Sequence, residues 1–158
     1  MIKIITGKIN SGKTTKMIEA YEENHVGDGF VSLKFMHQDK VDHYEVMKLS
    51  TKEKKVLMIH HDSPLFVEPK DIVIGPYHLQ DDAILWVEQE MSKMIKRGVT
   101  PLYLDELGLL ELENHGFHQT VCEMISSKLD LIFVVRSYLL EEIIKKYKCD
   151  QAEIIETS

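Results

Sequence analysis

Near the start of the chain, a short apolar run gives way to a glycine-flanked segment and then to a helical pattern. The run contains the β-branched residues Ile2, Ile4 and Ile5, which favour a strand. From residue 13 to about residue 23 the spacing of apolar positions is helical. The beginning of the chain is therefore predicted to be a strand, a loop and a helix.

Short strands separated by polar turns are predicted in the next part of the chain. They cover residues 30–35, 43–49 and 55–60. Strands connected by turns of a few residues favour an antiparallel ribbon. A further brief apolar run at residues 72–74 is closed by Gly75-Pro76, which indicates a turn.

A long helix is predicted over residues 80–97, because both of its ends carry suitable residues. Asp81 and Asp82 favour the positive amino end of a helix, and Gly98 suits the position just past the carboxyl end. The stripe of this helix that faces the core is expected to consist of Ile84, Val87, Met91, Met94 and Ile95.

Strands and helices alternate over the rest of the chain. The predicted strands cover residues 99–104, 131–135 and 152–155, and the predicted helices cover residues 117–128 and 138–147. This alternation predicts an α/β fold in which a mostly parallel sheet carries helices on both faces. We found no repeat, low-complexity stretch or linker, so we expect a single domain over residues 1–158 with a small antiparallel β insertion at about 30–60.

Composition narrows the range of partners. A chain of 158 residues with 44% hydrophobic content is long enough for one sizeable core. The formal net charge of -7 disfavours a broad basic surface, so we expect neither nucleic acid nor membrane as a partner. The two cysteines form no CxxC pair, and with no leader-like segment at the amino end they favour a cytoplasmic protein with reduced thiols.

The glycine-flanked segment matches the phosphate-loop pattern GxxxxGK[ST]. Its residues are Gly7, Lys8, Ile9, Asn10, Ser11, Gly12, Lys13 and Thr14, with Thr15 following. A strand precedes it and a helix follows, which is the context that this pattern requires. The backbone N–H groups of such a loop bind the phosphates of a nucleoside triphosphate, the lysine neutralises their charge, and the hydroxyl of Thr14 is placed to bind Mg²⁺.

A second part of the site is predicted where the strand at residues 99–104 ends on Asp105-Glu106. An acid at this edge of a parallel sheet lies beside the phosphate loop, so Asp105 is expected to hold Mg²⁺. Side chains alternate along a strand, so Glu106 points elsewhere than Asp105. It could polarise the attacking water, or it could be a solvated carboxylate or a salt-bridge partner. Residues 105–108 also fit the DxxG pattern of small GTPases, but no NKxD sequence follows, so guanine selectivity is unsupported.

Over essentially its whole length, the chain resembles the THEP1-type nucleoside-triphosphatase family. The resemblance rests on the phosphate loop, Gly29-Phe30, Gly75-Pro76-Tyr77 and, above all, residues 105–112 with Phe117 following. It implies a RecA-like P-loop NTPase fold and Mg²⁺-dependent hydrolysis of nucleoside triphosphates to diphosphates, with loose base selectivity. The clearest departure is Leu33-Lys34-Phe35-Met36, where this family usually has a Thr-x-Glu-x-Arg pattern. If that arginine touches the nucleotide in relatives, its role is empty here or passes to Lys34.

The sequence gives weaker evidence for a functional role of Arg136 and of two histidine clusters. Arg136 follows the strand at residues 131–135 and could reach the γ phosphate as a catalytic residue, or it could pair with Glu141 or cap a helix. Two histidine clusters superficially resemble parts of a zinc site. They are His60, His61 and Asp62, and His115 and His118 near Glu113. Neither has the ligand count that zinc requires, so polar loop residues are the favoured interpretation.

The leading hypothesis is therefore an enzyme that hydrolyses nucleoside triphosphates with Mg²⁺, in which Lys13, Glu106 and Arg136 are the candidate catalytic residues. A small-molecule or nucleotide kinase shares the loop, but it needs a cluster of mobile cations, and only two arginines, Arg97 and Arg136, occur in the chain. A nucleotide-dependent switch with incidental hydrolysis, acting on an unknown protein partner, is the third hypothesis.

Overall fold

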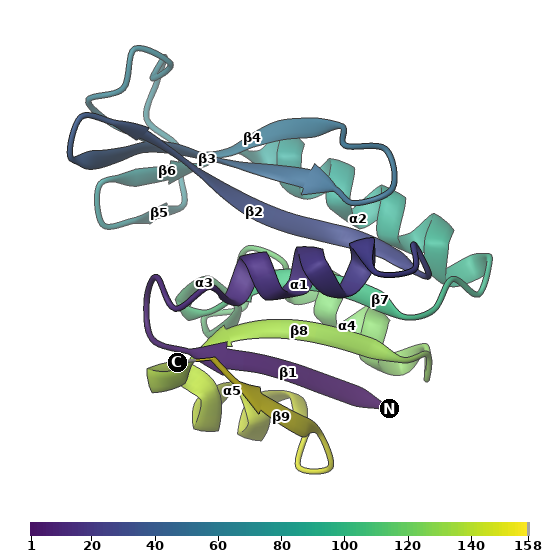
Figure 1. Cartoon of the computed structure of the whole chain (residues 1–158). Coiled ribbons are helices and arrows are strands. Elements are labelled where there is room, and N and C mark those ends of the chain that lie inside the picture. Colours follow the sequence, from purple (N-terminus) through teal and green to yellow (C-terminus); the bar gives the residue numbers. More distant parts are fainter. Residues whose placement is uncertain (158) are drawn as a thin grey trace.

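One sheet of nine strands runs through the computed structural model, which describes residues 1–157 (Figure 1). The strand order is β5-β6-β4-β3-β2-β7-β8-β1-β9. The strands are β1 (Ile2–Gly7), β2 (Asp28–His37), β3 (Lys40–Lys48), β4 (Lys54–His60), β5 (Val73–Ile74), β6 (Tyr77–Leu79), β7 (Leu102–Leu107), β8 (Leu131–Arg136) and β9 (Glu153–Glu156). Strands β2, β7, β8, β1 and β9 pair in parallel, and the remaining pairs are antiparallel.

The antiparallel strands continue the parallel sheet through β2. At its beginning β2 pairs in parallel with β7, and from Phe30 to His37 it pairs antiparallel with β3. The antiparallel part also extends past residue 60, because β6, directly after the turn expected at Gly75-Pro76, pairs with β4 in the register Met58↔Leu79. The expected limit of about 60 was therefore too early, since strand pairing between segments distant in sequence leaves no local pattern. The single-domain interpretation stays a prediction.

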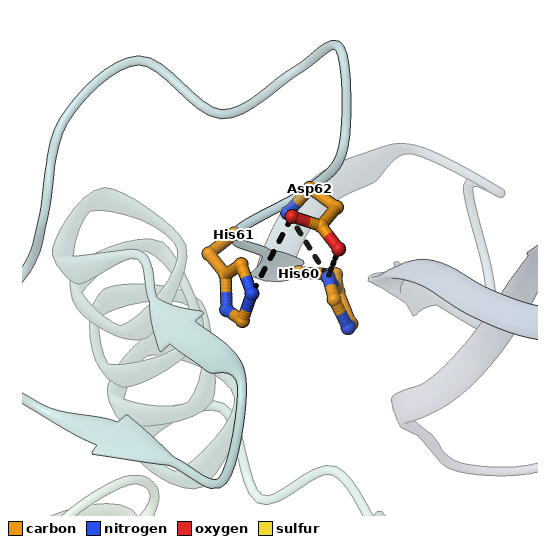
Figure 2. Close-up of side chains that lie close together, drawn as sticks. All are labelled: His60, His61 and Asp62. Carbon is orange, nitrogen blue, oxygen red and sulfur yellow. Dashed lines mark hydrogen bonds and ion pairs between the residues drawn. The ribbon is translucent and has the colours of Figure 1, made fainter.

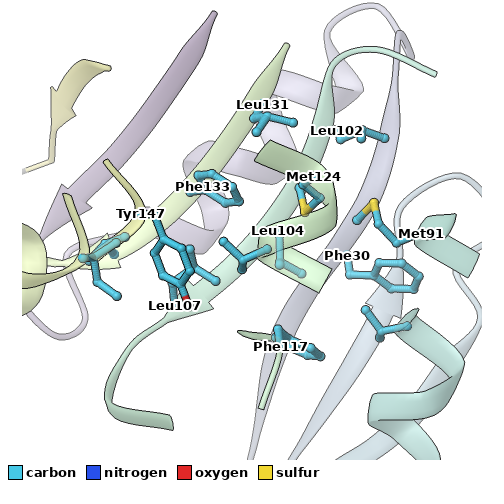
Figure 3. Packing of buried hydrophobic residues seen from close by; sticks show 14 of the residues in the cluster. Phe30, Met91, Leu102, Leu104, Leu107, Phe117, Met124, Leu131, Phe133 and Tyr147 are labelled. Atoms are coloured by element: carbon cyan, nitrogen blue, oxygen red, sulfur yellow. The ribbon is translucent and has the colours of Figure 1, made fainter. Parts of the chain in front are cut away.

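Helices cover both faces of the sheet, as the alternating pattern predicts. They are α1 (Lys13–Glu22), α2 (Asp81–Lys96), α3 (Leu109–Leu112), α4 (His118–Ser126) and α5 (Leu140–Tyr147), which follows a 3-10 turn at Ser137–Leu139. Successive residues of a strand face opposite sides. Accordingly, Tyr103 packs with α1 in one cluster, and Leu102 and Leu104 pack with α2, α4 and α5 in the other (Figure 3). The central strands of the sheet are thus enclosed between two apolar layers.

The long helix α2 shows why these elements form. Asp81 and Asp82 lie in its first turn, two lysines lie in its last turn, and Gly98 just beyond it has a φ of 70°. Of the expected stripe, Val87, Met91 and Met94 are fully buried and Ile84 and Ile95 are partly buried. Ala83 is also fully buried, although the apolar pattern did not predict it.

Boundaries differ from the expected ones near the functional part of the chain. The strand expected from residue 99 begins at Leu102, after Pro101, which has no N–H to donate to a neighbouring strand. It continues through Asp105 and Glu106 to Leu107, although its pairing with β8 is irregular between Leu104 and Leu107. The short helix α3 was not expected. Among the described residues, no helix is both long and apolar enough to cross a membrane.

Candidate active site

The predicted phosphate loop connects β1 to α1, and two of its glycines are required by its geometry. Gly12 precedes α1 with φ at 84°, a left-handed conformation that is strained for residues with a side chain. A Cβ atom on Gly7 would collide with the hydroxyl groups of Thr157 and Ser11. The loop therefore keeps its backbone free of side-chain bulk at both positions.

Contacts within the loop and from the end of β9 hold its shape. The Lys13 ammonium donates a hydrogen bond across the loop to the Lys8 carbonyl at 2.6 Å. The hydroxyls of Ser11 and Thr157 are 2.7 Å apart, and the Thr157 N–H donates to the Thr6 carbonyl at 2.8 Å. Sequence reasoning missed Thr157, because no spacing rule connects residues that lie so far apart along the chain.

Asp105 lies next to the first helical residues after the loop. The Thr14 hydroxyl donates to Asp105 Oδ2 at 2.8 Å, and the Ser32 N–H donates to the same oxygen at 3.0 Å. The other oxygen, Oδ1, is buried and has no hydrogen-bond partner among the described residues. Burial, together with the negative charge of Glu106, raises the pKa of Asp105 to about 7 against these hydrogen bonds.

The donor atoms at this point fit a magnesium ion. A hydroxyl oxygen and a carboxylate oxygen are hard ligands of the kind that Mg²⁺ prefers. The unpartnered Oδ1 of Asp105 adds a second carboxylate oxygen whose hydrogen-bonding capacity is unused. Thr14 and Asp105 could therefore hold the ion together.

Glu106 and Arg136 meet at the same edge of the sheet. Arg136 ends β8, and its Nε lies 3.5 Å from Glu106 Oε2, with about a third of each side chain exposed. Glu106 has a φ of 63°, an uncommon value for a residue with a side chain, at the point where pairing with β8 is irregular. Arg136 thus pairs with Glu106 and, within residues 1–157, makes no ion pair with Glu141.

The charges of this site act on Lys13, which is 5% exposed. Burial lowers the pKa of Lys13, and the cations Arg136 and Lys34 lower it further, whereas Glu106 and Asp105 raise it. Lys34 comes from the stretch of β2 that departs from the family pattern. Its ammonium donates to the Asn10 side chain, so a cation of β2 does reach the loop.

A pocket of about 150 Å³ brings the predicted residues together. Its charged and hydroxyl-bearing side chains come from four strands and one helix: Lys13, Thr14, Ser32, Lys34, Tyr44, Glu106 and Arg136. A neighbouring hollow of about 290 Å³ is lined by residues 10–15 with Lys34 and Glu106, which places Thr15 beside the loop. Ile9 lines the smaller pocket, whereas Gly7 and Lys8 line neither hollow. Tyr44 was missed, since nothing in a ribbon sequence marks it.

Glu111 supports the segment that follows Asp105 and Glu106. Its two carboxylate oxygens accept hydrogen bonds from the backbone N–H groups of Gly108 at 2.7 Å and Phe117 at 2.9 Å. The side chain is 3% exposed, and burial raises its pKa to about 7, although both hydrogen bonds oppose the shift. The buried Glu111 side chain therefore connects the two ends of the segment around α3, Gly108 and Phe117.

Replacing Glu111 by glutamine is expected to make stability less sensitive to pH. The folded-state pKa of about 7 lies above the ordinary 4.5, so the folded protein keeps a proton that the unfolded chain releases between these values. This contribution is complete below about pH 4.5, falls as pH rises, and is lost above about pH 7; it amounts to about 3 kcal/mol. Urea unfolding at pH 5 and pH 7.5 should show the parent losing more stability than Glu111→Gln. Glu113→Gln, at an exposed position, should follow the parent.

The histidine clusters show no comparable organisation. His60, His61 and Asp62 have ligand atoms within 4.8 Å of one another, but His61 and Asp62 are exposed (Figure 2). Lys40 binds the Asp62 carboxylate at 3.3 Å, and His60 Nδ1 accepts the Asp62 N–H at 3.0 Å, so two of the three ligands are engaged. His118 turns to the Tyr147 hydroxyl at 2.7 Å. Polar interactions within the protein therefore engage His60, Asp62 and His118.

The chain is similar in sequence and in structure to known proteins. A profile described as NTPase matches residues 3–157. The Nucleoside-triphosphatase THEP1 of Natranaerobius thermophilus is 28% identical over 134 residues, which cover 84% of this chain and 73% of that protein. The crystal structure of THEP1 from the hyperthermophile Aquifex aeolicus matches with a TM-score of 0.75 at 18% identity, covering 100% of this chain and 90% of that one.

A second solved structure, a human cancer-related nucleoside triphosphatase, has a TM-score of 0.66 at 16% identity and covers 99% of this chain and 88% of that one. At these identities the two structures show the α/β fold, and the profile over residues 3–157 shows the family. The chain therefore belongs to the NTPase family, the enzymes that hydrolyse nucleoside triphosphates.

Proposed function

We propose that this enzyme hydrolyses nucleoside triphosphates to diphosphates in a magnesium-dependent reaction with loose base selectivity. The observation that carries the proposal is the 2.8 Å contact between the Thr14 hydroxyl and the Asp105 carboxylate. It joins the phosphate loop to the acid at the end of β7, the two parts that a magnesium–triphosphate complex needs.

The loop between β1 and α1 binds the phosphates of the nucleotide. Its N–H groups and the amino end of α1 offer hydrogen bonds and a positive potential to the phosphates. The Lys13 ammonium, which reaches the Lys8 carbonyl in this structure, exchanges that carbonyl for phosphate oxygens. Lys34, beside Asn10, adds a second positive charge at the edge of the loop.

Thr14 and Asp105 are the residues that would hold Mg²⁺. When bound, the ion neutralises charge on the phosphate oxygens. The hydrogen bond from the Ser32 N–H keeps the Asp105 carboxylate oriented toward Thr14. Asp105 is 1% exposed, so its carboxyl group is shielded from bulk water. Its interactions with cations are therefore stronger than they would be at the surface.

We assign the chemical step to Glu106 and Arg136. The Glu106 carboxylate takes a proton from the water that attacks the γ phosphorus. Arg136, 3.5 Å from Glu106, stabilises negative charge that develops on the γ-phosphate oxygens. Both side chains are partly exposed, which allows water to reach them.

Phosphate release with four nucleotides tests this function. ATP, GTP, CTP and UTP are expected to give rates within about tenfold of one another, because a base-reading NKxD sequence is missing from the chain. Chelation of magnesium by EDTA should remove activity with all four nucleotides, and added MgCl₂ should restore it. Strong preference for one base, or full activity in EDTA, would refute the corresponding part of the proposal.

We place the enzyme in the cytoplasm, because a reducing compartment suits the free thiols of Cys122 and Cys149. The formal net charge of -7 argues against nucleic acid and anionic membranes as partners.

A further inference from the structure

A larger cavity lies beside the phosphate site. Its volume is about 350 Å³, and its walls are mostly apolar, with Leu57, Met58, Ile74, Leu79, Leu107 and Phe117 among them. Charged groups are few. Arg136 is the one cation among its described lining residues, and it is already paired with Glu106. Glu111, the remaining lining acid, has both oxygens bound to backbone N–H groups.

The cavity lies on the Glu106 side of the phosphate loop. It shares Ser32, Tyr44, Glu106 and Arg136 with the 150 Å³ pocket that contains Lys13. Of the described residues in the loop from Gly7 to Thr14, none lines it. In a bound triphosphate the base and sugar lie beyond the α phosphate, at the opposite end from the γ phosphate that faces Glu106. The cavity is therefore placed to receive the nucleophile and not the base.

The dimensions and chemistry of the cavity define what fits it. At roughly 30 Å³ per water-sized unit, 350 Å³ holds about a dozen non-hydrogen atoms. Apolar walls favour a flat, uncharged body, and the phenol rings of Tyr44 and Tyr138 beside Arg136 suit an aromatic ring. An anionic acceptor such as a nucleotide lacks a free cation there. An uncharged acceptor, unlike an anionic one, does not need a cluster of arginines.

We propose that the cavity binds a small uncharged alcohol with an apolar or aromatic body, and that the enzyme transfers the γ-phosphoryl group to its hydroxyl. The inference rests on the proposed nucleotide site. The alcohol oxygen attacks the γ phosphorus and forms a new O–P bond. The bond between that phosphorus and the β–γ bridging oxygen breaks, the nucleoside diphosphate leaves with its electron pair, and Glu106 receives the hydroxyl proton. Water takes the same position when no alcohol is bound.

The test is to incubate the enzyme with ATP and MgCl₂, with and without benzyl alcohol or 2-phenylethanol near their solubility limits. Phosphorus NMR separates the phosphate monoester from inorganic phosphate. Both aromatic alcohols are expected to give their monoesters, whereas xylitol, a polyol of similar size, is expected to give inorganic phosphate alone. Inorganic phosphate as the sole product with every alcohol would overturn the transfer. Monoester formation without any phosphate release in buffer alone would instead overturn the hydrolysis and leave the transfer intact.

A pair of neighbouring variants tests the place of binding. Ile74 lines the cavity and Val73, next to it on β5, is 49% exposed and does not. Ile74→Trp fills part of the cavity and is expected to lower the ratio of monoester to phosphate about tenfold, which is about 1.4 kcal/mol. Val73→Trp should keep the parent ratio.

Leu109→Trp repeats the test in case Ile74→Trp does not fold. Leu109 also lines the cavity, but its side chain is 44% exposed, so added bulk is tolerated there. The midpoint of thermal unfolding shows whether each variant is folded. Parent-like product ratios in folded Ile74→Trp and Leu109→Trp would overturn the placement of the alcohol in this cavity.

Discussion

Phosphate release is expected to fall by about two to three orders of magnitude when Lys13 is replaced by methionine. Methionine has a similar length and is also a good helix former, so α1 should still begin at residue 13. What disappears is the ammonium group of a buried side chain, to which we assign the neutralisation of the β and γ phosphates. The effect on the reaction should therefore be far larger than the effect on folding.

Steady-state phosphate release is measured for Lys13→Met and for Lys16→Met. The comparison separates the loss of the Lys13 ammonium from the loss of any one lysine charge on α1. Lys16 is exposed on the same helix and lines neither hollow at the loop. Lys16→Met should keep activity within about twofold of the parent, as expected of an exposed position outside the site. Equal activity of the two variants would show that Lys13 does not serve the reaction.

Glutamine in place of Glu106 is expected to lower phosphate release by about two to four orders of magnitude, because the amide cannot take a proton from water. The loss should appear in the turnover number and leave nucleotide affinity close to that of the parent, since Lys13, Thr14 and Asp105 are unchanged. Stability should change by about 1 kcal/mol or less, because the pair with Arg136 is a third exposed.

Turnover and nucleotide affinity are best compared in Glu106→Gln, the parent and Glu141→Gln. Glu141 is exposed in the first turn of α5, and the same chemical change there should leave turnover unaltered. A Glu106→Gln enzyme with parental turnover would remove the carboxylate from the mechanism. In that case its contact with Arg136 would be a surface ion pair and nothing more.

The predicted magnesium ligands and the predicted proton acceptor differ in how well the sequence alone specified their surroundings. Asp105 was predicted to stand beside Thr14 because both follow parallel strands whose carboxyl ends share one edge, and their side chains are 2.8 Å apart. For Glu106 the sequence left a catalytic and a salt-bridge interpretation open. The structure shows the ion pair with Arg136 at 3.5 Å, and the catalytic role stays a prediction.

The sequence by itself determined the elements with strong local signals. The glycine pattern of the phosphate loop, the charged ends of α2 and the buried runs of β7 and β8 are all read over a few neighbouring residues. Local backbone preference and apolar periodicity act over that range, so these elements were predictable together with the family. Their boundaries shifted where a single residue decided pairing, as Pro101 did at the start of β7.

Only the tertiary structure decided which distant segments meet. The contact of Thr157 with Ser11, the pairing of β6 with β4, and the presence of Tyr44 beside Arg136 join residues that lie far apart along the chain. The apolar cavity next to Glu106 arises in the same way, from β4, β5, α3 and the loop before α4. Such contacts follow from the packing of whole elements against one another, which leaves no periodic trace in the sequence.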